Sequence, residues 1–168
     1  DCGPATISMS QDVQGEPFDY PEIFFEEKIH EIRRIHPDPN QIKEAADKLK
    51  KSSQPIIISG GGVLYSEAEE EISNFAKKHN IPVTATVMGI GCMNKDDPYY
   101  ISAIGCLGEG SSNNLATDTD LALAVGTKLG DFTTGSWTNF ENENFQLVSI
   151  NTSRFDTTKH RATPVISD

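Results

Sequence analysis

Runs of apolar residues alternate with amphipathic segments along most of this chain. Each apolar run has the length of a buried strand, and each amphipathic segment repeats its apolar residues at helical spacing. This alternation predicts parallel strands that are covered by helices on both faces. We therefore expect an α/β fold, with a Rossmann-like, doubly wound, mostly parallel six-stranded sheet. The apolar runs are residues 55–59, 81–86, 121–125, 146–150 and 164–166.

Two helices have clear boundary signals. Asp38 suits the N-cap of the first helix, and Pro39 suits its first helical position. Ser66 and Glu69 have the spacing of a capping box, which predicts that the second helix begins near Ser66. Asn80 is expected to end that helix in the left-handed conformation. The side chains predicted to face the core are Ile42, Ala45, Ala46, Leu49, Ala68, Ile72, Phe75 and Ala76.

The first forty residues differ from this regular pattern. Residues 5–9 alternate like a strand but stand alone, so residues 1–14 are interpreted as the end of a preceding domain. Residues 15–39 contain several prolines and are predicted to be a linker. Residues 40–168 form the expected Rossmann-like domain. Because the chain begins without an initiator Met, we interpret it as a fragment of a longer enzyme.

Charge and cysteine content narrow the class of partners. A formal net charge of -11 disfavours nucleic acid and anionic membranes. Three cysteines without CxxC spacing favour reduced thiols in a cytoplasmic protein, with Cys92 and Cys106 buried. The histidines share no metal-ligand spacing. Trp137 is predicted to pack under a loop together with Phe132 and Phe140, and a subunit contact is the alternative.

Glycine-rich turns follow the strands at 55–59 and 121–125, where doubly wound sheets bind anionic ligands, and a further glycine-rich loop spans 105–112. An ordinary NAD site is nevertheless disfavoured. Tyr65 stands where the third small residue of GxGxxG belongs, and no acidic residue ends the 81–86 strand to hold a ribose. Gly126-Thr127-Lys128 lacks the glycine spacing of a Walker loop.

A set of ordered motifs runs across nearly the whole chain and consists of Gly3-Pro4, Gln11–Val13, Gly60–Gly62, the loop 105–111, Asp120–Leu129 and Ser149–Asn151. These motifs resemble the central domain of thiamine-diphosphate-dependent enzymes, the superfamily of acetolactate synthases and decarboxylases. A second set consists of residues 18–21, 60–66, 131–138 and 151–160. This set resembles, more narrowly, the trihydroxycyclohexane-dione hydrolases of myo-inositol catabolism.

The resemblance implies a parent protein of three domains that binds thiamine diphosphate and Mg2+ as a homodimer or tetramer. The cofactor and the catalytic glutamate would belong to flanking pyrimidine- and pyrophosphate-binding domains, of which residues 1–14 would be the end of the first. Here Gly130-Asp131 continues with Phe132 where the magnesium motif needs glycine. We therefore expect no catalytic residue, metal site or turnover in this chain. The parent would attack a carbonyl with the thiazolium ylid and hydrolyse a ring C–C bond.

In the same superfamily the central domain holds FAD, holds ADP or is empty, as the resemblance implies. Glu109 would place a carboxylate where a phosphate approaches, so we expect glycines that serve tight turns in an empty cleft. The alternative is the FAD- or ADP-binding domain of an acetolactate synthase-like enzyme. A free-standing sirtuin-like module would need four zinc-binding cysteines, which three cannot supply. The candidate lining residues are Gly60, Gly61, Gly62, Gly108, Glu109, Gly110, Ser111, Gly126, Thr127 and Asn151.

Overall fold

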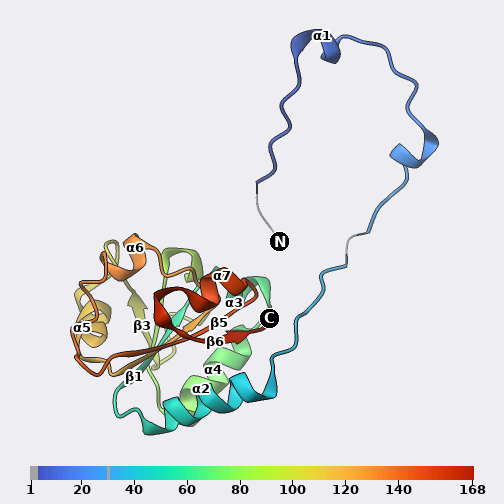
Figure 1. Cartoon of the computed structure of the whole chain (residues 1–168). Coiled ribbons are helices and arrows are strands. Elements are labelled where there is room, and N and C mark those ends of the chain that lie inside the picture. The colour runs from blue at the N-terminus through green and yellow to red at the C-terminus, as the bar shows by residue number, and fades with distance from the viewer. Residues whose placement is uncertain (1–3, 30) are drawn as a thin grey trace. The chain divides into compact units, whose positions relative to one another are not determined.

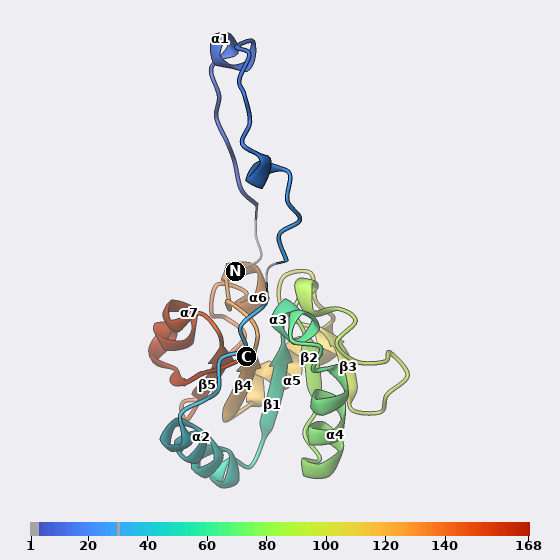
Figure 2. The same ribbon diagram turned by 90° about the vertical axis from the view of Figure 1, so that its right-hand side faces the viewer.

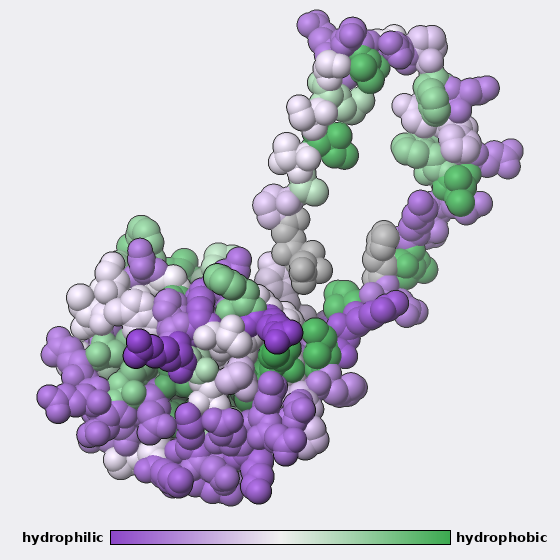
Figure 3. Space-filling view, viewed as in Figure 1, coloured by the Kyte–Doolittle hydropathy of each residue, from purple (hydrophilic) through white to green (hydrophobic). Residues whose placement is uncertain are grey.

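The structure is a computed structural model that describes residues 4–29 and 31–168, and it divides into two units, Asp1–Arg33 and Arg34–Asp168. In the first unit the described residues form a short helix α1 (Gln11–Gln14) and a 3-10 turn η1 (Glu22–Phe24). Their side chains are exposed, and Figure 3 shows apolar residues along this unit. Residues 5–9 form no strand in the structure, and the interpretation of residues 1–14 as the end of a preceding domain stays a prediction.

The second unit is built on six parallel strands in the order β3-β2-β1-β4-β5-β6. This order is that of the doubly wound dinucleotide-binding folds, so the predicted fold class is confirmed and the sheet is parallel throughout. The edge strand β3 was not among the strands located from the sequence. The strands are β1 (Pro55–Ser59), β2 (Val83–Ala85), β3 (Tyr100–Ala103), β4 (Leu121–Val125), β5 (Gln146–Asn151) and β6 (Thr163–Ile166).

Helices pack on both faces of this sheet (Figures 1 and 2). Successive residues of β1 face opposite cores, since Ile57 belongs to one buried cluster and Ile56 and Ile58 to the other. The first cluster includes residues of α3 and α4, and the second includes Ala116 of α5. The helical elements are α2 (Pro39–Lys51), α3 (Gly61–Tyr65), α4 (Glu69–His79), η2 (Val87–Gly89), α5 (Gly110–Asp118), α6 (Asp131–Thr134), α7 (Arg154–Thr158) and η3 (Lys159–Arg161).

The predicted helix boundaries are confirmed at two places and wrong at one. Asp38 caps α2 by accepting a hydrogen bond from the Asn40 N–H at 2.7 Å. Asn80 ends α4 with φ 56°. The capping box at Ser66 is absent, because α3 already begins in the glycine turn and Ser66 ends it. Its hydroxyl donates to the carboxylate of Asp168 instead.

Some of the predictions of which side chains are buried are confirmed, and others are wrong. Ile72 and Ala76 of α4 are buried, whereas Ile42 of α2 is 46% exposed. Cys92 is buried and burial raises the pKa of its thiol, but Cys106 is exposed. Cys2 lies outside the described residues. Trp137 and Phe140 pack against the second core cluster, with ring centroids 5.5 Å apart, while Phe132 is exposed.

Candidate functional site

A ligand cleft is expected where β1 and β4 end, because the strand order reverses direction between these two neighbours. Gly60–Gly62 leaves β1 at this point, and Gly126 and Thr127 leave β4 beside it. The structure brings the two turns into direct contact. The Gly60 N–H donates to the Val125 carbonyl at 2.8 Å, and the Gly62 N–H donates to the Gly126 carbonyl at 2.9 Å.

This contact explains why the turns are made of glycine. A methyl group at Gly62 would lie 2.5 Å from the Gly126 Cα, and one at Gly60 would lie 2.3 Å from the Gly126 carbonyl oxygen. Gly126 also has φ +61°, a conformation that glycine adopts without strain. The glycines therefore let two backbone segments touch. Two of the N–H groups expected to face an anion instead bond to carbonyls of the same domain.

Asn151 extends the same network to β5. Its side-chain NH2 donates to the Thr127 carbonyl at 3.2 Å, and its side-chain oxygen accepts from the Ser153 N–H at 2.9 Å. The Gly126 N–H donates to the Ile150 carbonyl at 2.9 Å. The predicted lining residues that follow β1, β4 and β5 are thus brought together, and the bonds of Asn151 are made within the domain.

Gly108–Ser111, the second predicted glycine loop, follows β3, and β2 separates β3 from β1. Just before this loop, the Cys106 N–H donates to the Phe132 carbonyl at 2.7 Å, which joins it to the segment after β4. Asn113 holds this loop, because its side chain accepts from the Gly105 N–H at 2.9 Å and donates to the Gly105 carbonyl at 3.1 Å. Glu109 is exposed and makes no capping bond to α5 with its side chain.

Tyr65 occupies the third position of the GxGxxG motif, where a large residue was expected to disturb the turn. In the structure it does not. Helix α3 ends at Tyr65, and this side chain is exposed. The close approach to β4 is made by Gly62, near the start of α3. A short first helix therefore takes the place of the long helix of an ordinary dinucleotide site.

Among residues 4–29 and 31–168, no group of three or more His, Cys, Asp and Glu side chains is arranged to hold a metal ion. The same residues contain no helix that is both long enough and apolar enough to cross a bilayer. The sequence predicts a solvated or capping role for the histidines. In the structure His160 lies against Trp137, with ring centroids 4.3 Å apart. Burial lowers the pKa of its imidazole, and the neighbouring Lys159 lowers it further.

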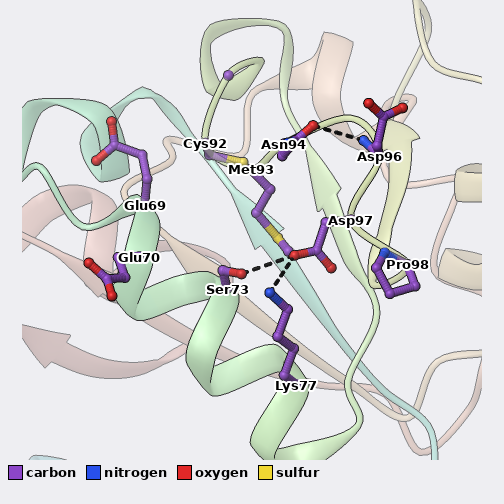
Figure 4. Close-up of a pocket in the computed structure, with 11 residues that line it drawn as sticks. Glu69, Glu70, Ser73, Lys77, Cys92, Met93, Asn94, Asp96, Asp97 and Pro98 are labelled. Atoms are coloured by element: carbon purple, nitrogen blue, oxygen red, sulfur yellow. Dashed lines mark hydrogen bonds and ion pairs between the residues drawn. The ribbon is translucent and has the colours of Figure 1, made fainter.

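A polar depression of 470 Å³, which the sequence did not indicate, lies between α4 and the loop before β3 (Figure 4). Asp97 is its central group and accepts from Lys77 Nζ at 2.9 Å and from the Ser73 hydroxyl at 3.0 Å. The hydrogen bond from Lys77 lowers the pKa of the Asp97 carboxyl. Asp97 also accepts from the Tyr99 N–H at 3.1 Å, so it fixes the loop that leads into β3.

The strand order and the glycine turns define a doubly wound domain of the dinucleotide-binding type whose first turn is filled by backbone contacts. Residues 42–168 match the family model described as the thiamine pyrophosphate enzyme, central domain, and the chain belongs to this family. It is similar to two curated relatives named 3D-(3,5/4)-trihydroxycyclohexane-1,2-dione hydrolase. The relative from Bacillus thuringiensis (strain Al Hakam) is 39% identical over 168 residues, and the one from Clostridium tetani is 41% identical over 166 residues.

These alignments cover 100% and 99% of the chain, but 26% of each relative, so the chain spans about a quarter of their length. A solved structure from Mycobacterium smegmatis, whose name assigns it to the thiamin diphosphate-dependent enzymes, has a similar fold. It superposes with a TM-score of 0.64 at 17% identity, over 84% of this chain and 28% of the other. This likeness confirms the fold.

Proposed function

We propose that this chain is the central domain of a thiamine-diphosphate-dependent hydrolase that cleaves a ring C–C bond of trihydroxycyclohexane-1,2-dione in myo-inositol catabolism. The observation that carries the proposal is the 39% identity over the whole chain to relatives of that name. The residues present do not fit thiamine diphosphate or Mg2+, since Phe132 follows Gly130-Asp131 where the magnesium motif needs glycine. Cofactor binding and catalysis are therefore assigned to the flanking domains of a cytoplasmic homodimer or tetramer.

The experiment is an assay of the full-length protein that contains these residues. We expect it to open the ring of the diketone when thiamine diphosphate and Mg2+ are supplied, and to lose that activity without them. Residues 1–168 alone are expected to show no turnover under the same conditions. A full-length protein that condenses pyruvate and leaves the cyclic diketone intact would contradict the proposal and favour an acetolactate synthase.

We also propose that the cleft between β1 and β4 serves packing and takes no nucleotide. Supporting this are the N–H groups of Gly60 and Gly62, which donate to carbonyls of Val125 and Gly126. A pyrophosphate at this turn would have to replace those bonds. The exposed carboxylate of Glu109 at the start of α5 adds repulsion toward an anion.

Titration of residues 1–168 with FAD and with ADP by calorimetry tests this role. We expect no heat of binding at micromolar concentrations of either nucleotide. Glu109→Gln is the matched variant, since it removes the charge and keeps the shape of the side chain. Micromolar affinity in the unsubstituted chain would contradict the packing role and return the glycine turn to a ligand site.

A further inference from the structure

The backbone around Trp137 and His160 holds most of the left-handed residues of this chain. Seven non-glycine residues have a positive φ in the part of the chain that the structure describes, and five of them belong to this region. Such a backbone costs free energy for a residue that carries a side chain, so its surroundings have to hold it in place. The five are Leu129 (φ 47°), Ser136 (φ 55°), Trp137 (φ 68°), His160 (φ 59°) and Arg161 (φ 58°).

The rings of Trp137 and His160 join two of these strained segments. Their centroids are 4.3 Å apart, and the ring planes are tilted by 54°. Trp137 also contacts Phe140, which stacks on Phe145 next to the start of β5. The Trp137 N–H donates to the Thr134 hydroxyl at 3.2 Å, so the indole is fixed from its own side.

The turn that contains His160 leads directly into the edge strand β6. Its backbone is closed by a hydrogen bond from the Ala162 N–H to the Lys159 carbonyl at 3.2 Å. Inside this turn, His160 departs from helical geometry with φ 59° and ψ 23°. The contact with the Trp137 ring therefore braces a strained turn just before β6 begins.

His160 can take up a proton at this place, since the residue is exposed to solvent. The charged groups that act on its imidazole are Lys159 in the same turn and Asp131 of α6. Burial lowers the pKa of the imidazole and Lys159 lowers it further, and together they outweigh the Leu129 carbonyl and Asp131, which raise it. The closed turn therefore favours the neutral imidazole.

We propose that the contact between Trp137 and His160 is a pH-sensitive switch, which holds residues 158–162 in a closed turn while the imidazole is neutral and releases them when it is protonated. This inference does not depend on the proposed function. Its sign follows from linkage, because an open turn returns the histidine to its ordinary pKa of about 6.5. The closed turn is fully stable above about pH 6.5 and loses stability as the pH falls through the lower pKa of the closed form.

Tryptophan fluorescence gives a direct readout, because Trp137 is the only tryptophan in the sequence. Emission from residues 1–168 is followed from about pH 8 to about pH 5, with circular dichroism as a check that the fold persists. We expect one transition with its midpoint below about pH 6.5. A midpoint above that value would show that attraction between the imidazolium and the indole ring dominates, and it would overturn the proposal.

Two histidine variants identify the titrating group. His160→Gln should abolish the fluorescence transition. His79→Gln is the matched control, since His79 also contacts an aromatic ring, that of Phe75, with centroids 4.5 Å apart. The transition should persist unchanged in His79→Gln. Persistence of the transition in a folded His160→Gln variant would overturn the proposal.

Variants of the charged neighbours keep His160 in place and move the midpoint in opposite directions. Lys159→Gln removes a positive charge and should raise the midpoint, whereas Asp131→Asn removes a negative charge and should lower it. A contact that only packs would show neither shift. Midpoints that stay fixed, or that move in the reverse order, would contradict the switch.

Amide hydrogen exchange followed by mass spectrometry measures the release itself. After correction for the intrinsic effect of pH on exchange, we expect protection of residues 158–162 to fall about fivefold or more between pH 7.5 and pH 5.5. Protection of α2 should stay constant over this range, and His160→Gln should remove the pH dependence at 158–162. Equal losses in α2 would indicate general acid unfolding and refute the switch. A fluorescence transition without loss of protection at 158–162 would refute it as well.

Discussion

The two edges of the sheet are closed by different chemistry. At the amino edge, the carboxylate of Asp120 accepts hydrogen bonds from the Ser53 N–H at 2.7 Å, the Gln54 N–H at 3.1 Å and the Ser52 hydroxyl. At the carboxyl edge, glycine backbones touch one another and large apolar side chains face outward. A polar edge whose bonds are complete can remain in water. An edge with an exposed apolar surface gains free energy when another surface covers it.

The largest effect is expected from a side chain added inside the glycine contact. Gly62→Ala would place a methyl group 2.5 Å from the Gly126 Cα, where only backbone can move aside. We expect a loss of about 3 kcal/mol or more in the free energy of unfolding, measured with urea. Gly110→Ala on the same edge is the control. It has nothing within 4 Å and should change stability by less than about 0.5 kcal/mol. Similar losses in both variants would show that the backbone contact is not the cause.

A smaller effect is expected where the carboxyl edge depends on a side chain. Asn113→Ala removes both bonds to Gly105 and leaves a partly buried N–H without its acceptor. We expect a loss of about 2 kcal/mol in urea unfolding. Asn113→Asp keeps the acceptor and loses the donor, so its stability should lie between that of the unsubstituted protein and that of the Ala variant. An Asp variant less stable than the Ala variant would indicate that charge at this position outweighs the retained bond.

The amino edge is expected to respond to pH. Burial alone would raise the pKa of Asp120, but hydrogen bonds from Ser52, Ser53 and Gln54 outweigh it and lower the pKa to about 2. Because the folded pKa is below the unfolded value, the stabilisation is full above about pH 4 and is lost as pH falls toward 2. We expect the ionised Asp120 carboxylate to contribute about 1 kcal/mol to the free energy of unfolding, after allowance for solvent screening.

Thermal unfolding between pH 2 and 7 measures this dependence. Asp120→Asn should flatten its acid limb and lower stability at pH 7, whereas Asp118→Asn, a change at an exposed neighbouring carboxylate, should leave the limb in place. An unchanged limb in Asp120→Asn would assign the acid sensitivity to other carboxylates. The charge of Asp120 would then not be what stabilises the amino edge.

The smallest effect is expected from Arg34→Ala. The ion pair with Asp168 is 3.0 Å long, but the Arg34 side chain is half exposed, and exposed pairs contribute about 0.5 kcal/mol. The Ser66 hydroxyl also lowers the pKa of Asp168 and keeps its carboxylate in place. We expect Arg34→Ala to lose about 0.5 kcal/mol of stability in thermal unfolding. Arg34→Lys should lose less than Arg34→Ala. A loss above about 2 kcal/mol would show that the Tyr65 carbonyl bond matters more than the pair.

Most of the fold follows from the sequence because it depends on periodicity. Strands β1 and β4 are continuous apolar runs that are buried on both faces, and such runs are readable from composition alone. Strand β3 escapes this test because its residues are only partly buried and its register with β2 shifts. The helix start at Gly61 was missed for a related reason. Its N-cap Gly60 makes no side-chain capping bond, so no residue signals it.

The sequence predicts where the candidate site lies, but it does not predict how the N–H groups of the site are hydrogen-bonded. Gly60–Gly62, Gly126 and Asn151 meet as expected, since each lies at the carboxyl end of a neighbouring parallel strand. Whether their N–H groups face a ligand or a carbonyl depends on the distance between two turns, which sequence does not encode locally. Gly108–Ser111 is included with them because the family resemblance implies it, and the structure places this loop after β3, a strand that the sequence did not locate.

The adjacency of Arg34 and Asp168 has a consequence for how such a domain is inherited. A folded unit whose incoming and outgoing chain lie side by side can be added to or removed from a polypeptide with little change in the separation of its neighbours.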